Sequence, residues 1–143
     1  MFAVLFAGMS TIPVCFAEEL QLSTTSVPAP GRAVKSVYAG ANYSAILYNN
    51  GMVSTFGANN FGQLGHGTNE GVNVPTDIEG LTDVDTLSTG QYHVFAIKED
   101  GTVWSWGRNN FGQLGDGTRD DKNEPVPISF ISDIKSISAG NDH

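Results

Sequence analysis

The sequence predicts an all-β protein made of β-propeller blades, with two blades of about fifty residues and the start of a third, and so an incomplete propeller. A heptapeptide, Asn-Asn-Phe-Gly-Gln-Leu-Gly, occurs at residues 59–65 and recurs letter for letter at 109–115. Short apolar runs, each ending at a glycine or a turn dipeptide, recur at the same offset. Seventeen glycines indicate many turns and few long helices. Three or four short strands in each repeat match a propeller blade.

Length and charge narrow the class of protein. A chain of 143 residues normally makes about one domain. The net charge of −8 argues against a nucleic-acid-binding surface, for which basic residues supply most of the affinity. It argues equally against a polybasic protein of the membrane surface. Acidity by itself mainly keeps a protein soluble.

The first residues differ from the rest of the chain. Residues 1–17 contain an apolar run at 2–7 and end in Cys15-Phe16-Ala17, after which two acidic residues follow. This pattern is typical of a secretory signal peptide, although the usual basic residue at the start is missing. The alternative is a short buried apolar strand or helix. We therefore expect an exported protein (extracellular, periplasmic or at the cell surface), or a cytoplasmic one if the segment is not a signal.

The segment after the predicted cleavage site is a linker. Residues 18–33 are rich in Ser, Thr and Pro and show no hydrophobic period. Residues 1–17 are too short for a comfortable membrane span, so we expect no integral membrane protein once the signal is removed. Cys15 is the only cysteine, so the mature chain has no disulfide, thiolate metal site or catalytic cysteine.

The repeats occupy residues 34–83, 84–133 and, in part, 134–143. Asn50-Gly51 and Asp100-Gly101 stand between apolar runs, which predicts hairpin turns with both turn residues at positive φ. A later stretch in each repeat contains a proline, which suits an edge strand because proline cannot donate to a ladder. The predicted strands are 35–39, 44–48 and 52–56 in the first repeat and 85–89, 94–98 and 102–106 in the second, with the proline-containing stretches at 74–78 and 124–128.

Three motifs resemble the regulator of chromosome condensation repeat. They are Gly-x-Asn-x-Phe-Gly-Gln-Leu-Gly-x-Gly at residues 57–67 and 107–117, Asp-Gly-Thr-Val-Trp-Ser-Trp-Gly at 100–107, and Ala-Gly-Asn-Asp-His at 139–143. The resemblance covers residues 34–143. It implies a propeller of about seven blades. We therefore expect this chain to be a fragment of a longer protein, or to complete a ring by oligomerisation.

The heptapeptide and the two residues after it, which we call the shared loop (residues 59–67 and 109–117), are predicted to be structural. Glycines permit tight turns, Phe and Leu can pack between blades, and Asn and Gln amides can bond the loop's own backbone. A phosphate site is not expected, because Gly67 and Gly117 stand where a P-loop has its lysine. Trp104 and Trp106 are predicted to form core between blades rather than a stacking platform for a ligand. The structural positions are Gly57, Phe61, Gly62, Leu64 and Gly65, with Gly107, Phe111, Gly112, Leu114 and Gly115 in the second repeat.

The sequence predicts no metal site, cofactor or catalytic centre. An acidic run begins at Asp116, but its spacing does not match an EF-hand, so we interpret it as a solvated loop. No other cluster offers three ligands at metal spacing. No nucleophile-and-base or paired-carboxylate arrangement is identifiable, so we do not expect an enzyme. The acidic residues of the run are Asp116, Asp120, Asp121 and Glu124.

The candidate binding surface is the turn after the first strand of each repeat. A glycine is kept at 40, 90 and 140, while the residues after it change from copy to copy. A fixed frame with variable polar and aromatic tips is typical of a binding surface, although simple tolerance of loop variation is the alternative. Tyr92 is the predicted anchor. The candidate residues are Asn42, Tyr43, Gln91, Tyr92, His93, Asn141, Asp142 and His143.

Three functions are compatible with the resemblance. The first is an exported propeller that binds an unidentified protein, as the family's secreted β-lactamase-inhibiting member does. The second is a guanine-nucleotide exchange factor for a small GTPase, since acidic and His residues in such turns face the GTPase in the family's exchange factor. Asp142, His143 and His93 match those residues, whereas Tyr92 departs from the pattern. The third is a purely structural surface module.

Overall fold

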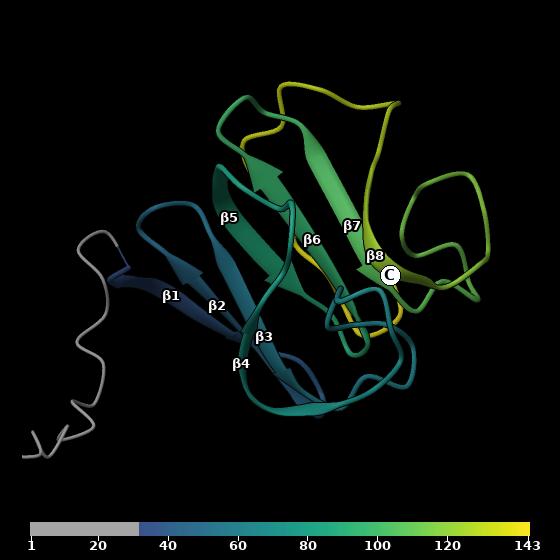
Figure 1. Ribbon diagram of the computed structural model, residues 1–143. Helices are drawn as coiled ribbons and strands as arrows, with labels where there is room; N and C mark the ends of the chain where they lie inside the picture. The colour runs from purple at the N-terminus through teal and green to yellow at the C-terminus, as the bar shows by residue number, and fades with distance from the viewer. Residues whose placement is uncertain (1–31) are drawn as a thin grey trace, which may run out of the picture.

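The computed structural model describes residues 32–143, so the predicted signal peptide and nearly all of the predicted linker lie outside the described residues. The described chain forms two four-stranded antiparallel sheets (Figure 1). The predicted all-β class is confirmed. No helix within residues 32–143 is long and apolar enough to cross a membrane. The strands are β1 (Val34–Ala39), β2 (Tyr43–Tyr48), β3 (Val53–Gly57) and β4 (Val72–Asp77), then β5 (Val84–Thr89), β6 (His93–Lys98), β7 (Val103–Gly107) and β8 (Lys122–Pro127).

The two sheets share one register, as the repeat predicts. Tyr43 pairs with Gly57 across β2 and β3, and His93 pairs with Gly107 across β6 and β7. The first strands are irregular at the same place, between Val34 and Ser36 and between Val84 and Thr86. The proline-containing stretches form the outer strands β4 and β8, which pair only with β3 and β7. A proline therefore costs little there, because an edge strand leaves one side of its backbone without a partner.

The hairpin turns lie where the sequence predicts them, but their geometry differs. Tyr48 N donates to Met52 O at 3.0 Å, so the loop between β2 and β3 holds three residues. Only Gly51 has a positive φ, of 75°. The expectation for Asn50 is wrong, because its side chain accepts a hydrogen bond from Met52 N at 3.2 Å in a turn that keeps φ negative. The second hairpin repeats this arrangement, with Gly101 at 80° and Asp100 bonded to Thr102 N.

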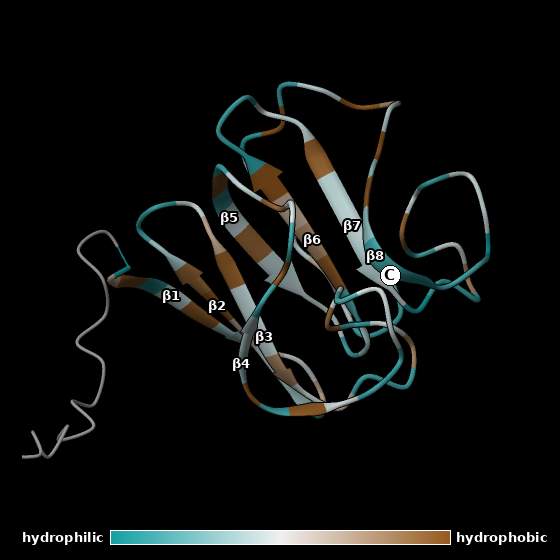
Figure 2. Cartoon of the chain, in the orientation of Figure 1, coloured by the Kyte–Doolittle hydropathy of each residue, from teal (hydrophilic) through white to brown (hydrophobic). Residues whose placement is uncertain are grey.

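The core lies mainly between the two blades. A cluster of buried side chains runs from β2 and β3 of the first sheet to β5, β6 and β7 of the second, and Figure 2 shows apolar residues concentrated on these strands. Trp106 is fully buried in it and donates from Nε1 to the Gln63 carbonyl at 3.0 Å. Trp104 packs against the same cluster but is only half-buried. The tryptophans therefore contribute to packing between blades.

The third repeat contributes to a second, smaller core. Ile134, Ile137 and Ala139 pack against the second blade's own cluster, which includes Phe95 and Val103. Residues 134–143 form no strand. These residues correspond to the first strand of a repeat. In the two complete repeats that strand pairs only with the second strand, β1 with β2 and β5 with β6.

The shared loop is closed by its own amides, as predicted. Asn59 Oδ1 accepts from Leu64 N at 2.9 Å, while its Nδ2 donates to the carbonyls of Thr68 and Glu70. Gln63 Oε1 accepts from Phe61 N at 2.9 Å. The second loop forms the same bonds from Asn109 and Gln113.

The apolar residues of the loop divide into two groups. Leu64 and Leu114 are both fully buried. Phe61 is half-buried, whereas Phe111 is 64% exposed. The two phenylalanines differ because no side chain of the described third repeat covers the Phe111 ring, whereas Tyr92 of the second repeat covers Phe61.

Candidate functional site

The three predicted turns lie together at one end of the sheets. Ala41 N donates to the Gln91 carbonyl at 3.2 Å, and Gln91 N donates to the Asn141 carbonyl at 3.2 Å. A shallow hollow is lined by the ends of the first strands and by these turns. The backbone thus joins successive turns into one rim, which brings Asn42, Gln91, Tyr92, Asn141 and Asp142 to the same edge of the molecule.

The third residue of each complete turn points into the protein instead. Tyr43 is 3% exposed and donates from its hydroxyl to the carbonyls of His93, at 2.8 Å, and Gly90, at 3.2 Å. Burial raises the pKa of the Tyr43 phenol far above its ordinary value, so the hydroxyl remains a donor. His93 is fully buried. Neither side chain is available to a partner, which corrects their place among the candidate binding residues.

The ring of this third residue also explains the glycine that starts each turn. A Cβ atom on Gly40 would lie 1.9 Å from Cε1 of Tyr43, closer than any real contact. The corresponding distance is 2.2 Å for Gly90 and His93 and 2.1 Å for Gly140 and His143. The glycine is therefore kept because a ring occupies the space that a Cβ atom would need.

His93 lies where the second blade meets the third repeat. Its ring meets Phe95 edge-on, with centroids 5.5 Å apart. Neither ring nitrogen makes a hydrogen bond of normal geometry within residues 32–143. Burial lowers the pKa of His93, and the nearby His143 backbone and Asp142 carboxylate offset this only in part. The ring is thus an uncharged packing element at the junction.

A cluster around Arg108, the one member that sequence reasoning missed, extends the rim. The Phe61 and Tyr92 rings contact one another, with centroids 5.0 Å apart. Arg108 places its guanidinium carbon 5.0 Å from the Phe61 centroid, 5.8 Å from that of Tyr92 and 5.7 Å from that of Phe111. Its Nη1 lies 3.8 Å from Asp142 Oδ1. We name these five residues the arginine cluster.

The arginine cluster draws on both shared loops and on two of the turns. Arg108 precedes the second loop, where the first repeat has Ala58, so the only sequence signal for Arg108 itself was that the two copies differ at this position. Cations near ring faces and tyrosine hydroxyls favour recognition of a protein surface.

The acidic side chains in the loop of the second repeat stabilise the loop itself. Asp116 Oδ1 accepts from Thr118 N at 2.8 Å and from Asn109 Nδ2 at 3.1 Å. Partial burial raises the pKa of Asp116, but these bonds and Lys122 outweigh it and lower the pKa overall. Asp121 Oδ1 accepts from Asn109 N. Within residues 32–143, no three His, Cys, Asp or Glu side chains are grouped so that they could hold a metal ion.

Comparison with known proteins gives the same repeat. The family model described as "Regulator of chromosome condensation (RCC1) repeat" matches residues 50–97 and 100–143, and a second model of that repeat matches 34–63 and 84–113. E3 ubiquitin-protein ligase HERC2 of human and of mouse is 33% identical over 72 residues, which are 49% of this chain and 2% of that protein.

Two solved structures share the fold. Human WBSCR16 has a TM-score of 0.70 and 26% identity, over 80% of this chain and 31% of that one. Yeast RCC1 (Prp20), solved with Kap60 bound, has a TM-score of 0.66 and 28% identity, over 76% of this chain and 26% of that one. The chain therefore spans about a third or less of the proteins it matches.

Proposed function

Because this chain belongs to the regulator of chromosome condensation (RCC1) repeat family, we propose that it is an exported protein-interaction module whose partner docks on the rim at Tyr92, Arg108 and Asp142. The observation that carries the proposal is the guanidinium of Arg108, held among three aromatic rings while its side chain remains 25% exposed. Tyr and Arg are enriched among the residues that dominate binding energy, and a tyrosine offers rigid contact area at low entropic cost.

The backbone holds this rim in place. Arg108 N donates to the Tyr92 carbonyl at 2.9 Å. The two segments approach so closely that a Cβ atom on Gly107 would lie 2.3 Å from the Tyr92 oxygen. A surface fixed in this way loses little freedom on binding, which favours affinity. Yeast RCC1, which shares this fold, was solved with the protein Kap60 bound, so a similar protein is known to bind a protein partner.

The export part of the proposal rests on residues 1–17 and has its own test. Mass spectrometry of the protein from its native source measures the first residue of the mature chain. A start near Glu18 in the exported fraction supports export. An intact Met1 in the cytosol contradicts it and favours the alternative, a guanine-nucleotide exchange factor.

The binding part is tested with the full-length protein and a partner cross-linked to it. Tyr92→Ala and Asp142→Ala are compared with Glu99→Ala, which changes an exposed residue of a hairpin turn. We expect Tyr92→Ala to weaken binding about thirtyfold, since truncating a dominant contact costs about 2 kcal/mol. Melting curves verify that each variant is folded. If Glu99→Ala weakens binding while the two rim variants bind normally, the rim is not the interface.

The proposed role is binding without catalysis. The rim offers aromatic faces, a guanidinium and a carboxylate, and these are recognition groups. The acidic side chains Asp116 and Asp121 are engaged by the backbone of their own loop.

A further inference from the structure

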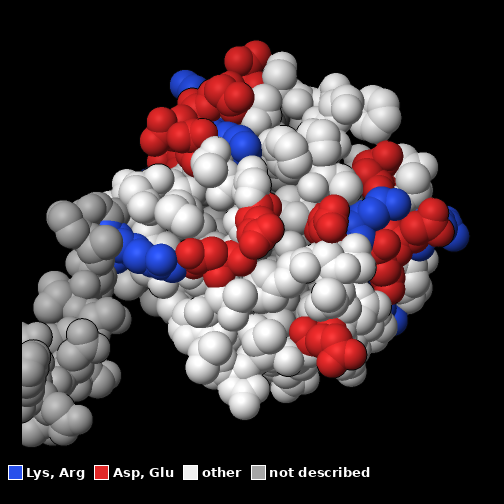
Figure 3. All heavy atoms as spheres, in the orientation of Figure 1, with Lys and Arg blue, Asp and Glu red and all other residues white. Residues whose placement is uncertain are grey.

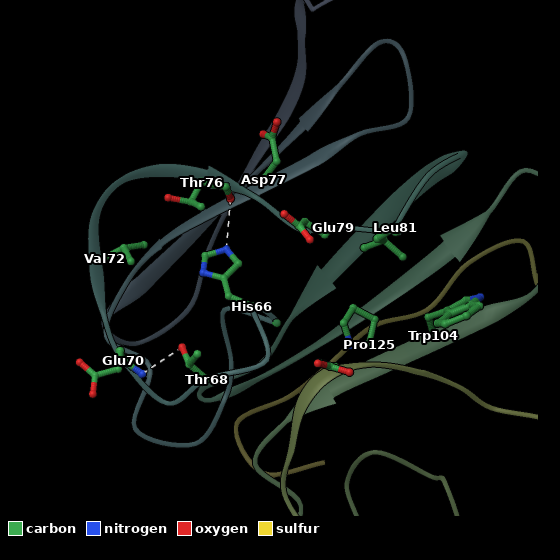
Figure 4. Close-up of a pocket in the computed structure, with 13 residues that line it drawn as sticks. His66, Thr68, Glu70, Val72, Thr76, Asp77, Glu79, Leu81, Trp104 and Pro125 are labelled. Carbon is green, nitrogen blue, oxygen red and sulfur yellow. Dashed lines mark hydrogen bonds between the residues drawn. The ribbon is translucent and has the colours of Figure 1, made fainter.

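A groove separates the outer strands of the two blades, and none of its lining residues belongs to the rim. Its volume is about 470 Å³, within the usual range for ligand-binding clefts. One wall is β4 and the segment after it, and the other is formed by β7 and β8 (Figure 4). His66 of the first shared loop stands between the walls, where its Nε2 lies 2.9 Å from Thr55 Oγ1 and 3.2 Å from the Thr76 carbonyl.

The floor of the groove is apolar. Leu81 is buried, and Trp104 and Pro125 are half-buried beside it. Trp104 already carries an ammonium group on its ring, because Lys98 Nζ lies 4.7 Å from the ring centroid. The site therefore combines surface for an aliphatic chain with an indole suited to a cation.

The mouth of the groove carries carboxylates that lack cationic partners. Glu70, Glu79 and Glu124 line it, are exposed and form no ion pair with any of residues 32–143. Asp77 also lines it and is paired with Arg32. No Lys or Arg is among the lining residues, and acidic side chains predominate over basic ones on the face seen in Figure 3.

Glu124 is held over the groove by its surroundings. A Cβ atom on Gly67 would lie 2.7 Å from Glu124 Oε1, so the glycine leaves room for this carboxylate. Asn123, the preceding residue, donates from Nδ2 to the Gly67 carbonyl at 3.0 Å and accepts from Gly67 N at 2.8 Å. The first shared loop thus fixes the strand that carries Glu124.

We propose that this groove binds a lysine or arginine side chain presented by an extended basic segment of a partner protein. The aliphatic part of that side chain lies on Leu81, Trp104 and Pro125, and its charged head lies between Glu79 and Glu124. A bare metal ion fits less well, because the described residues place no three ligands together and the space greatly exceeds the roughly 30 Å³ of one water molecule. Charge complementarity therefore selects a long organic cation.

The probe for the test is a fluorescein-labelled eight-residue peptide that alternates lysine and glycine. Its match has every lysine acetylated, which removes the charge and keeps the aliphatic chain. Binding to the full-length protein is measured by fluorescence anisotropy at about physiological salt, where distant charges are screened. We expect the charged peptide to bind at least about tenfold more tightly than the acetylated one, a difference of about 1.4 kcal/mol.

Two double variants of equal net charge separate the groove from the general acidity of the protein. Glu79→Gln with Glu124→Gln removes two negative charges at the mouth of the groove, while Glu99→Gln with Asp120→Asn removes two exposed negative charges elsewhere. We expect the groove pair to weaken binding about tenfold and the control pair less than about twofold. Equal weakening by both pairs, or equal binding of the two peptides, overturns the proposal. Since all four residues are exposed and the changes nearly isosteric, both proteins should fold.

Discussion

The two shared loops have the same seven residues and the same internal hydrogen bonds, yet their surroundings differ. In the first loop, a Cβ atom on Gly62 would lie 2.4 Å from the Asn123 Cα of the next blade. In the second, no atom of residues 32–143 beyond the adjacent residues lies closer than 3.8 Å to the same point on Gly112. The backbone carbonyl of Gln63 also accepts a hydrogen bond from Trp106 Nε1 of the next blade.

The comparison shows that two kinds of information are combined in one heptapeptide. The fold of the loop is local, because its Asn and Gln amides bond its own backbone wherever it occurs. Its packing is not local, because the next repeat supplies the contacts. The loop is therefore a connector whose contribution to stability depends on what lies beside it.

The largest loss of stability is expected at the leucine that is buried in both loops. Leu64→Ala and Leu114→Ala should each lower the free energy of unfolding by about 2–5 kcal/mol, since both side chains are fully buried. Urea denaturation of the full-length protein measures the loss. An unchanged midpoint for either variant would show that the leucine does not pack as the structure places it.

The next effect separates the loops. Gly62 and Gly112 have φ of 76° and 78°, so alanine at either costs about 1–2 kcal/mol of backbone strain. Gly62→Ala should lose about 1–3 kcal/mol more, because its Cβ collides with the backbone of the next blade. Equal losses in thermal or chemical denaturation would mean that the first loop is not docked on the second blade.

A third comparison concerns Tyr43 and His93, which occupy equivalent positions. Burial lowers the pKa of His93 in the folded protein, so the unfolded state binds the proton more readily. The stability gained from its neutral form is present above the unfolded value near 6.5 and is lost as the pH falls through the lower folded value. Unfolding free energies measured from about pH 7.5 to about pH 5 should therefore decline, and the decline should be smaller in His93→Tyr. The same decline in both proteins would contradict this role for His93.

Much of this fold could be predicted from the sequence because its signals are local. Asn50-Gly51 marks a hairpin, and a proline in each repeat marks an outer strand. The inward direction of the Tyr43 and His93 side chains could not be predicted from the sequence, because it depends on a ring packing against a glycine three residues earlier.

The candidate sites were harder still. Arg108 meets Phe61 and Tyr92 only after two blades have packed, and the acidic groove is made by segments from both. Sequence spacing does not predict contacts between residues of different repeats. The one sign in the sequence was that the second repeat has Arg108 where the first has Ala58.

The claim that the first loop joins the blades is tested most directly by a double-mutant cycle on Phe61 and Tyr92. The rings lie 5.0 Å apart, centroid to centroid, and belong to different blades. Unfolding free energies of Phe61→Ala, Tyr92→Ala and the double variant should give a coupling of about 0.5–1.5 kcal/mol. Phe111→Ala, at the exposed counterpart, should cost little by itself and serves as the control. A coupling near zero, together with equal losses of unfolding free energy for Phe61→Ala and Phe111→Ala, would show that the first loop does not join the blades.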